Sequence, residues 1–301
     1  LYTGPRTILH NLRKTVERAG VQVENIVISP LALTRSILNE GEKEFGATVI
    51  DLGGGQTTVA VMRGQELQYT NIYQEGGDYI TKDISKVLTT SQSIAENLKF
   101  NYGIAYPQQA TEKEKFTVEV IGESNPVEVT ERYLSEVIAA RLRQIFTRVK
   151  QDLERTRALE LPGGVVLVGG GAILPGITEL AQEILGVNTK LYIPNQIGIR
   201  NPSFAHVIAL VEYVGGLDDV EKISQAAVNG EADLRQKPID IPVASKRPSA
   251  SPIVPKPVAV EPYSEEEVQA DAPAYVNNTE AEEPKSNIGD RLRGFFGSMF
   301  E

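Results

Sequence analysis

The sequence predicts an α/β layered fold over residues 1–216, because short strand patterns and helical patterns alternate along this stretch. Runs of β-branched and apolar residues at 48–50, 59–61 and 165–168 lie beside consecutive glycines. Apolar residues at helical spacing follow these runs. The chain has 301 residues and is 41% hydrophobic, which is enough for a sizeable core in one large domain or two smaller ones.

Residues 1–90 predict helices, a glycine-rich hairpin and a second glycine turn. The first helix ends at Gly20, which suits a C-cap, and Ser29-Pro30 stops the short apolar strand that follows. Three consecutive glycines separate the two strands of the hairpin, and Gly76-Gly77 marks the second turn. The expected elements are a helix at 1–20, a strand at 26–28, a helix at 31–38, strands at 48–50, 59–61 and 67–73, and a helix at 79–88.

Residues 89–216 predict a small edge sheet between two helices, and then a buried strand that runs into glycines. Ser91 or Ser93 suits the N-cap of the first helix, and Pro175 suits the first turn of a later one. The expected elements are a helix at 89–105, strands at 116–121 and 127–129, a helix at 130–159, a strand at 165–168, a helix at 177–185, a strand at 191–193 and a helix at 204–214.

The long helix predicted at 130–159 carries basic residues beside an apolar stripe of 3.6-residue period. The basic residues lie on other faces, and they are Arg141, Arg143, Arg148 and Lys150. A solvated helix face is the plainer interpretation of these charges, and a partner-binding face is the alternative.

The composition changes after Gly216. Nine of the chain's 17 prolines lie between Pro238 and Pro284, and residues 218–284 carry 14 acidic against 6 basic residues. Such a segment cannot bury enough apolar surface to order itself. The sequence therefore predicts a disordered, acidic, proline-rich linker over 217–284.

The last residues predict a short amphipathic helix within 285–301. Its apolar residues fall on one face, and they are Ile288, Leu292, Phe295, Phe296, Met299 and Phe300. Arg291 and Arg293 point elsewhere. A Phe-rich and Arg-rich helix at the end of a long tether is typical of an interfacial membrane anchor. Docking on this protein's own surface or on a partner is the alternative.

The composition also excludes several kinds of site. The net charge of −10 argues against a nucleic-acid binder, which would show a basic face. The absence of cysteine excludes disulfides and thiolate metal sites. His10 and His206 stand far apart in sequence and do not suggest a zinc site. No run of the sequence has the roughly 20 apolar residues of a spanning helix and no signal peptide opens it, so we expect a cytoplasmic protein.

Two glycine-rich signatures at strand ends carry the chemistry. Three glycines in a row, Gly53 to Gly55, leave backbone N–H groups uncovered, and such a surface can close on a phosphate. Asp51 leads into this turn where a magnesium ion would be held. The second signature, from Gly169 to Ala172, follows an apolar strand and can pass close under an adenine ring or its ribose. A tight turn without a ligand is the alternative for the first signature.

A third motif, Ala95-Glu96-Asn97-Leu98-Lys99, lies between the two signatures. Glu96 and Lys99 fall on one helix face, where they could also form an ordinary ion pair. The ordered set of three motifs resembles the actin-like ATPase superfamily. Together with the segment 76–84 and the terminal helix 288–296, it is most similar to the FtsA family of bacterial cell-division proteins.

The resemblance implies an actin-like, ribonuclease H-like second half of the body, with an inserted small α+β module. It implies a first phosphate loop that is not within these 301 residues. The implied parts are 1–22 as the end of an interaction subdomain, 23–90 plus 164–216 as the core, 91–163 as the inserted module, 217–284 as the linker, and 285–301 as the membrane-targeting helix.

The resemblance also implies a role for each motif residue in binding ATP and Mg²⁺. Asp51 would hold Mg²⁺ through water, and Glu96 and Lys99 would contact ribose and adenine. The β- and γ-phosphates would lie on Gly53, Gly54, Gly55, Gln56 and Thr57. Gly76 and Gly77 would lie near the cleft, and the adenosine would rest on Gly169, Gly170, Gly171 and Ala172.

The implied function is that of an adaptor at the division septum, on the cytoplasmic face of the cell membrane. It would bind ATP, self-associate into actin-like filaments, bind an anionic membrane surface, recruit later division proteins and anchor the FtsZ ring. The C-terminal peptide of FtsZ would dock on 91–163, for which the basic helix 141–150 is the nearest candidate. The alternatives are a rod-shape or pilus-assembly relative, or a chaperone-type or sugar-kinase-type ATPase.

Two departures from related ATPases predict slow hydrolysis at best, with no catalytic residue assigned. Relatives usually place Gln or Glu where this chain has Ser29-Pro30, and Asp or His where it has Thr58. A hydroxyl is a poor base at neutral pH. ATP would therefore act as a state switch for assembly.

Overall fold

The computed structural model describes residues 5–23, 25–122 and 125–229. Of these, the residues up to Lys222 belong to one compact unit, which contains the site described below. The strands are β1 (Ala47–Leu52), β2 (Thr57–Arg63), β3 (Glu66–Tyr73), β4 (Lys115–Val118), β5 (Val127–Thr130), β6 (Val165–Val168) and β7 (Thr189–Leu191). The α-helices are α1 (Arg6–Arg18), α2 (Ser29–Ile37), α3 (Glu40–Phe45), α4 (Gly77–Leu88), α5 (Gln92–Tyr102), α6 (Glu131–Arg155), α7 (Ile177–Leu185), α8 (Ala205–Gly215) and α9 (Asp219–Asn229).

A five-stranded mixed sheet forms the centre, in the order β3-β2-β1-β6-β7. The first three strands are antiparallel neighbours joined by short turns, whereas β1, β6 and β7 are parallel. Parallel neighbours need a long crossover connection. Between β2 and β6 the chain runs through β3, α4, α5, the small sheet and α6, so residues 91–163, which the sequence predicts as an inserted module, lie within this crossover.

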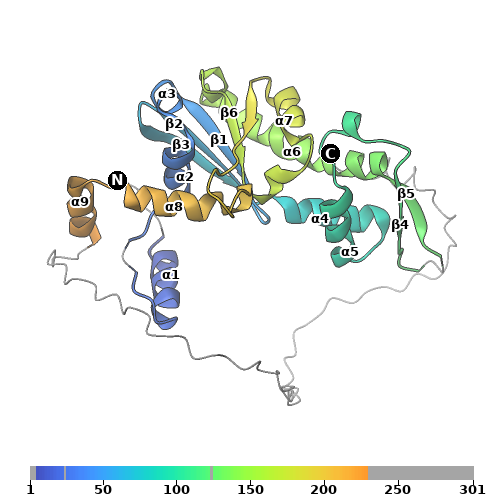
Figure 1. Ribbon diagram of the computed structural model, residues 1–301, viewed down its shortest axis with the longest axis horizontal. Helices are drawn as coiled ribbons and strands as arrows, with labels where there is room; N and C mark the ends of the chain where they lie inside the picture. The colour runs from blue at the N-terminus through green and yellow to red at the C-terminus, as the bar shows by residue number, and fades with distance from the viewer. Residues whose placement is uncertain (1–4, 24, 123–124, 230–301) are drawn as a thin grey trace, which may run out of the picture. The chain divides into compact units, whose positions relative to one another are not determined.

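Both faces of the central strands are covered (Figure 1). Along β1 every residue is buried, and alternate side chains enter different cores: Ile50 and Leu52 pack into one, Ala47 and Val49 into the other. The first core also takes residues from α4, α5, α6 and α7, and the second takes residues from α2 and α8. The strand period of two therefore produces a three-layer arrangement.

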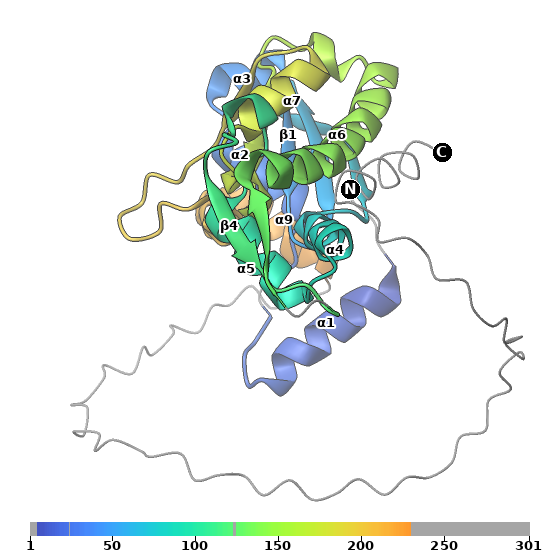
Figure 2. The ribbon, with the colours of Figure 1, turned by 90° about the vertical axis from the view of Figure 1, so that its right-hand side faces the viewer.

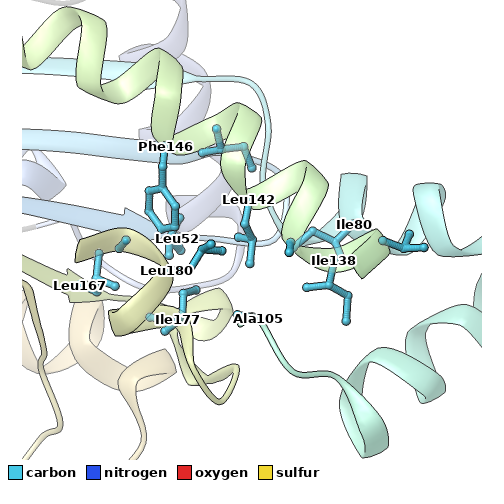
Figure 3. Close-up of a cluster of buried hydrophobic side chains, with 14 of the residues drawn as sticks. Leu52, Ile80, Ala105, Ile138, Leu142, Phe146, Leu167, Ile177 and Leu180 are labelled. Atoms are coloured by element: carbon cyan, nitrogen blue, oxygen red, sulfur yellow. The ribbon is translucent and has the colours of Figure 1, made fainter. Parts of the chain in front are cut away.

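Helix α6 supplies much of the first core. Its predicted apolar stripe is confirmed, because Leu142 and Phe146 are at most 2% exposed. In Figure 3 the stripe faces Leu52 of β1, Leu167 of β6 and the first turns of α7. Thr130 caps the helix by accepting a hydrogen bond from the Tyr133 N–H at 3.2 Å.

The second sheet is the antiparallel pair β4–β5, whose last residue leads directly into α6 (Figure 2). Its predicted edge-sheet pattern is confirmed, although β4 ends at Val118. The Tyr102 ring of α5 stacks on Phe116 with centroids 4.5 Å apart. Phe116, Val118 and Val129 belong to the first core, so the small sheet shares the core of the larger one.

Most predicted elements are confirmed, and four differ. The predicted strand at 26–28 is wrong: these residues are extended but pair with no strand among the described residues. Strand β7 begins two residues before the predicted strand at 191–193, because Thr189 pairs with Val165. Helix α3 was not predicted, although Asn39 and Glu42 form a reciprocal capping box at its start.

The fourth difference is α9, which lies where the sequence predicts the start of the linker. Asp218 accepts a hydrogen bond from the Glu221 N–H at 2.6 Å, and Asp219 and Glu221 place negative charge in the first turn. This charge stabilises the positive end of the helix dipole. The rest of the predicted linker and the whole predicted terminal helix lie outside the described residues.

None of the helices described here combines the length and the apolar character needed to cross a membrane.

Candidate functional site

The two glycine-rich signatures leave neighbouring strands at the same edge of the sheet. Asp51, near the end of β1, lies opposite Val168, the last residue of β6, in the parallel register. The loops 53–56 and 169–172 therefore begin side by side. In open α/β sheets, ligands bind in the crevice outside the carboxyl ends of parallel strands.

The first loop is attached to helix α4 by backbone hydrogen bonds. The N–H of Gly77 donates to the Gly53 carbonyl at 3.0 Å, and the N–H of Asp78 donates to the Gly54 carbonyl at 2.9 Å. The Thr57 hydroxyl donates to the Glu75 carbonyl at 2.7 Å, which holds the segment before α4 against β2. These bonds join the triple-glycine turn and the Gly76-Gly77 turn into one structure.

Position 76, in the junction between these two turns, requires glycine. A Cβ at this position would lie 2.4 Å from the Gly54 carbonyl oxygen and 2.5 Å from that of Gly53. Both neighbours are backbone atoms and cannot move aside cheaply.

Gly169 plays the matching part in the second loop. Its φ is +96°, and a Cβ would lie 2.4 Å from Asp51 Oδ1 and 2.6 Å from the Leu52 carbonyl oxygen. A left-handed conformation and lack of space both favour glycine here. The following residues form a short 3₁₀ turn, η3 (Gly170–Ile173).

A cavity of about 510 Å³ opens between these loops. Its lining comes from Gly53, Gly54, Gly77, Asp78, Ile80, Glu96, Lys99, Phe100, Gly103, Gly170, Gly171, Ile173, Leu174, Pro175, Asn201 and Ser203. One set of lining residues is glycine backbone, and another is apolar side chains from α5 and from η3 and the turn after it. This volume is typical of small-molecule and cofactor sites.

The ammonium group of Lys99 makes hydrogen bonds within the chain. Its Nζ donates to the Gly77 carbonyl at 3.1 Å, to Thr81 Oγ1 at 2.7 Å and to Glu96 Oε2 at 2.7 Å. An ammonium has three N–H donors, so these acceptors account for all of them. The side chain is only 12% exposed. Lys99 thereby joins α5 to the first turns of α4.

Glu96 is the more accessible partner of this pair, with its side chain 49% exposed. Burial acts to raise the pKa of Glu96, but hydrogen bonds from Lys99 and Thr81 and the charge of Lys99 outweigh it, so the pKa lies below its usual value. Glu96 therefore stays ionised at neutral pH.

Asp51 is buried behind the glycine loops and meets a histidine. Its Oδ2 lies 3.1 Å from Nε2 of His206, in the first turn of α8. This hydrogen bond raises the pKa of His206 above its ordinary value, against the opposing effect of burial. The other oxygen, Oδ1, is buried and has no hydrogen-bond partner within the described part of the chain.

The basic residues of α6 make contacts within the chain. Arg141 donates to both carboxylate oxygens of Asp83, at 2.5 and 3.0 Å, and is 13% exposed, so the prediction of a solvated face is wrong for Arg141. The other three pair with α7 or with the segment before α4: Arg143 with Glu183, Arg148 with Glu75, and Lys150 with the Ile184 carbonyl. The pattern predicted positive charge but not its partners, which lie far away in sequence.

Seven of the predicted site residues line the cavity: Gly53, Gly54, Gly77, Glu96, Lys99, Gly170 and Gly171. The others lie outside the lining, and they are Asp51, Gly55, Gln56, Thr57, Gly76, Gly169 and Ala172. Thr57 and Ala172 are fully buried. The predicted membrane residues at 288–300 lie outside the described part of the chain.

Sequence reasoning missed several residues that the fold brings to this site. Asp78 lines the cavity beside Gly54 and adds a carboxylate to it. Thr81 bridges Glu96 and Lys99 from one helical turn after Gly77. Phe100 was missed because aromatic side chains are usually expected in the core, whereas this residue is 80% exposed. No local signal connects His206 with Asp51.

The residues present fit a nucleotide with a divalent cation. The unpartnered Asp51 Oδ1 is an acceptor that a metal-bound water would satisfy, and a glycine cradle leaves room for phosphate. No group of three or more metal-ligating side chains occurs in the described residues. Mg²⁺ is usually held by one or two carboxylates, substrate phosphates and water, so a single carboxylate such as Asp51 suits it.

Two protein-family models match this chain. The family model "Cell division protein FtsA" matches residues 48–209, and the model "Cell division protein FtsA, C-terminal" matches residues 220–301. The chain belongs to the FtsA family. The predicted family is therefore confirmed, and the rod-shape, pilus, chaperone and sugar-kinase alternatives are not supported.

Curated relatives agree. The chain is 59% identical to the cell division protein FtsA of Streptococcus pneumoniae over all of its length, and 49% identical to that of Enterococcus hirae. It is 41% identical to the cell division protein FtsA of Bacillus subtilis over 71% of this chain. The chain spans 65% of the Streptococcus relative and 64% of the Enterococcus relative.

Solved structures confirm the actin-like fold. MreB5 of Spiroplasma citri bound to ADP superposes with a TM-score of 0.60 at 16% identity, over 75% of this chain and 68% of that one. The MamK double helical filament gives a TM-score of 0.53 at 14% identity, over 71% and 66%. The predicted fold class, α/β and actin-like, is thus confirmed for the described part.

Proposed function

We propose that this division protein binds ATP with Mg²⁺ in the cavity between the two glycine loops. The observation that supports this most directly is the meeting of both loops at the carboxyl ends of β1 and β6. MreB5, which shares the fold, has been solved with ADP and with AMPPNP. The phosphates would lie on the backbone of Gly53 and Gly54, and Asp51 would hold Mg²⁺ through water.

The nucleoside would occupy the other end of the cavity. Gly170 and Gly171 leave space for a flat ring, and Phe100, Ile173 and Leu174 supply an apolar wall. Glu96, half exposed and ionised, is suited to accept hydrogen bonds from ribose hydroxyls. Lys99 would support this end by holding α5 to α4, because its donors already have partners.

We expect slow hydrolysis, with ATP acting as a switch for assembly. Ser29 and Thr58 stand where related ATPases carry stronger bases, and Thr58 is buried at 7% exposure. Asp78 is a carboxylate beside the cradle, and its contribution to turnover is tested by Asp78→Asn. A turnover above about one per second in the intact protein would contradict the switch role.

The proposed cellular role is an adaptor between membrane and division ring. Residues 220–301 match the family's C-terminal model, and the anchor itself is inferred from the Phe-rich amphipathic pattern within 285–301. The helix at 288–300 would bind the anionic cytoplasmic face of the membrane at the septum, and actin-like self-association would multiply weak anchors through avidity. The module at 91–163 would take the C-terminal peptide of FtsZ, and other division proteins would join later.

The side chains that would meet the FtsZ peptide are not those suggested by charge alone. Arg141, Arg143, Arg148 and Lys150 pair within the chain, so a peptide would have to displace these contacts. A docking site on another part of 91–163 requires no such exchange. Arg143→Gln therefore serves as a test, and we expect it to leave peptide binding unchanged.

Liposome flotation of the intact protein tests the anchor. The variants are Phe295→Glu with Phe296→Glu, and a matched control with the same charge added in the linker, Val258→Glu with Val260→Glu. We expect the first pair to lose at least tenfold in binding to anionic liposomes and the control to float like wild type. Unchanged flotation of the first pair would refute the anchor. Runs with ATP, ADP or no nucleotide, with and without the FtsZ peptide, report whether nucleotide state alters attachment.

A further inference from the structure

His206 is a half-buried histidine that the proposed function does not use. It lies in the first turn of α8, and its Nε2 is 3.1 Å from Oδ2 of Asp51 at the end of β1. The two residues are far apart in the sequence, and the contact joins the helix layer to the strand that enters the triple-glycine turn.

The contact makes the two oxygens of Asp51 unequal. His206 occupies Oδ2, whereas Oδ1 is buried without a hydrogen-bond partner among the described residues. Gly169 approaches the Oδ1 side so closely that a Cβ there would lie 2.4 Å away. A carboxylate without the histidine could turn about its last bond and present either oxygen.

Burial increases the importance of this contact. The Asp51 side chain is 8% exposed, and a buried carboxylate that lacks hydrogen-bond donors is costly. Among the described residues, His206 is the one charged or polar side chain recorded against this carboxylate. Its loss would leave Asp51 free to change orientation.

The position of α8 does not depend on His206. Ala205 and Ala209 are fully buried in the second core, and Ile208 is 7% exposed, so packing against α2 holds the helix. The His206 side chain is 38% exposed, so replacing it creates little cavity. A change at His206 should therefore leave the fold intact.

We propose that His206 is a positioning residue, which holds Oδ2 of Asp51 so that Oδ1 remains the acceptor without a partner, which the water shell of the Mg²⁺ that accompanies the nucleotide would satisfy. The inference rests on the proposed ATP binding. It assigns His206 no contact with the nucleotide itself. The predicted consequence is a selective loss of Mg²⁺-dependent affinity.

The test is ATP binding by the intact protein, measured with a fluorescent ATP analogue in excess Mg²⁺ and again in excess EDTA. The variants are His206→Leu, which removes the donor, and His206→Gln, which keeps an N–H donor. The matched control is His10→Leu, at the exposed histidine of α1. We expect His206→Leu to bind at least fivefold more weakly in Mg²⁺ and unchanged in EDTA, and His206→Gln to retain most of the affinity.

A double-mutant cycle with Asp51→Asn adds a second readout. If His206 acts through Asp51, His206→Leu should have no further effect on Mg²⁺-dependent affinity once Asp51 is replaced. Additive losses, an equal loss in EDTA, or no loss in Mg²⁺ would each overturn the positioning role. Wild type that binds ATP in neither buffer would overturn the proposed function itself. Urea unfolding of each variant identifies a folding defect, in which case His206→Gln carries the comparison.

Discussion

The two ends of the cavity are built in different ways. Beside the triple-glycine turn the packing is so close that Gly76 has no room for a Cβ, and Gly169 of the second loop has none where it packs on Asp51 and Leu52. At the other end, the side chains of Phe100 and Ile173 are 80% and 43% exposed. The first end is closely packed without a ligand, whereas the second presents apolar surface that a ligand would cover.

Because of this difference, substitutions at the two ends of the cavity should affect the stability of the fold and the binding of a ligand in different ways. A change in the packed end should damage the fold and the site together, because the same backbone atoms serve both. A change in the exposed end should alter ligand binding while the free energy of unfolding stays the same. Lys99 lies between the two, since it ties α5 of the exposed end to α4 of the packed end.

The largest expected effect is that of Gly169→Ala. The new Cβ meets Asp51 Oδ1 and the Leu52 carbonyl, and φ stays at +96°, so we expect the free energy of unfolding to fall by about 3 kcal/mol. Gly186→Ala is the matched control, because φ is +75° there but nothing lies within 4 Å, and it should cost about 1 kcal/mol. Urea unfolding measures both. Equal costs for the two variants would show that crowding at Gly169 is relieved easily.

The next effect is that of Lys99→Met, which keeps the length of the side chain and removes its three hydrogen bonds. We expect a loss of about 2 kcal/mol in the free energy of unfolding, because charged hydrogen bonds in a side chain 12% exposed are lost. Lys115→Met removes an exposed pair with Glu128 and should cost less than about 0.5 kcal/mol. If the two variants unfold alike, Lys99 is no link between α4 and α5.

The smallest effect is that of Phe100→Ala. Stability should stay within about 0.5 kcal/mol of wild type, because the ring is 80% exposed. ATP affinity should fall about fivefold if the ring stacks on the base, while inorganic triphosphate binding should not change. Ile121→Ala, which is 69% exposed and outside the cavity lining, is the control. Equal affinity of Phe100→Ala and wild type would remove Phe100 from the nucleoside end.

The sequence alone was sufficient for the elements whose signals are local. The hairpin about Gly53 to Gly55, the apolar stripe of α6 and the strand before Gly169 follow from periodicity and turn chemistry, which act over a few residues. The segment 26–28 looked equally strand-like, yet a strand needs a partner, and no local pattern reports whether one is present. The start of β7 shifted for the same reason, because pairing with β6 determines it.

The sequence also located the two glycine turns that border the cavity, because glycine turns after strands are local features. Only the tertiary structure decided what each neighbouring side chain does there. It directed the ammonium of Lys99 to the Gly77 carbonyl, Arg141 to Asp83, and His206 to Asp51. These contacts join residues that are far apart in the chain, and their partners are decided by the distances that packing creates, which no pattern of neighbouring letters records.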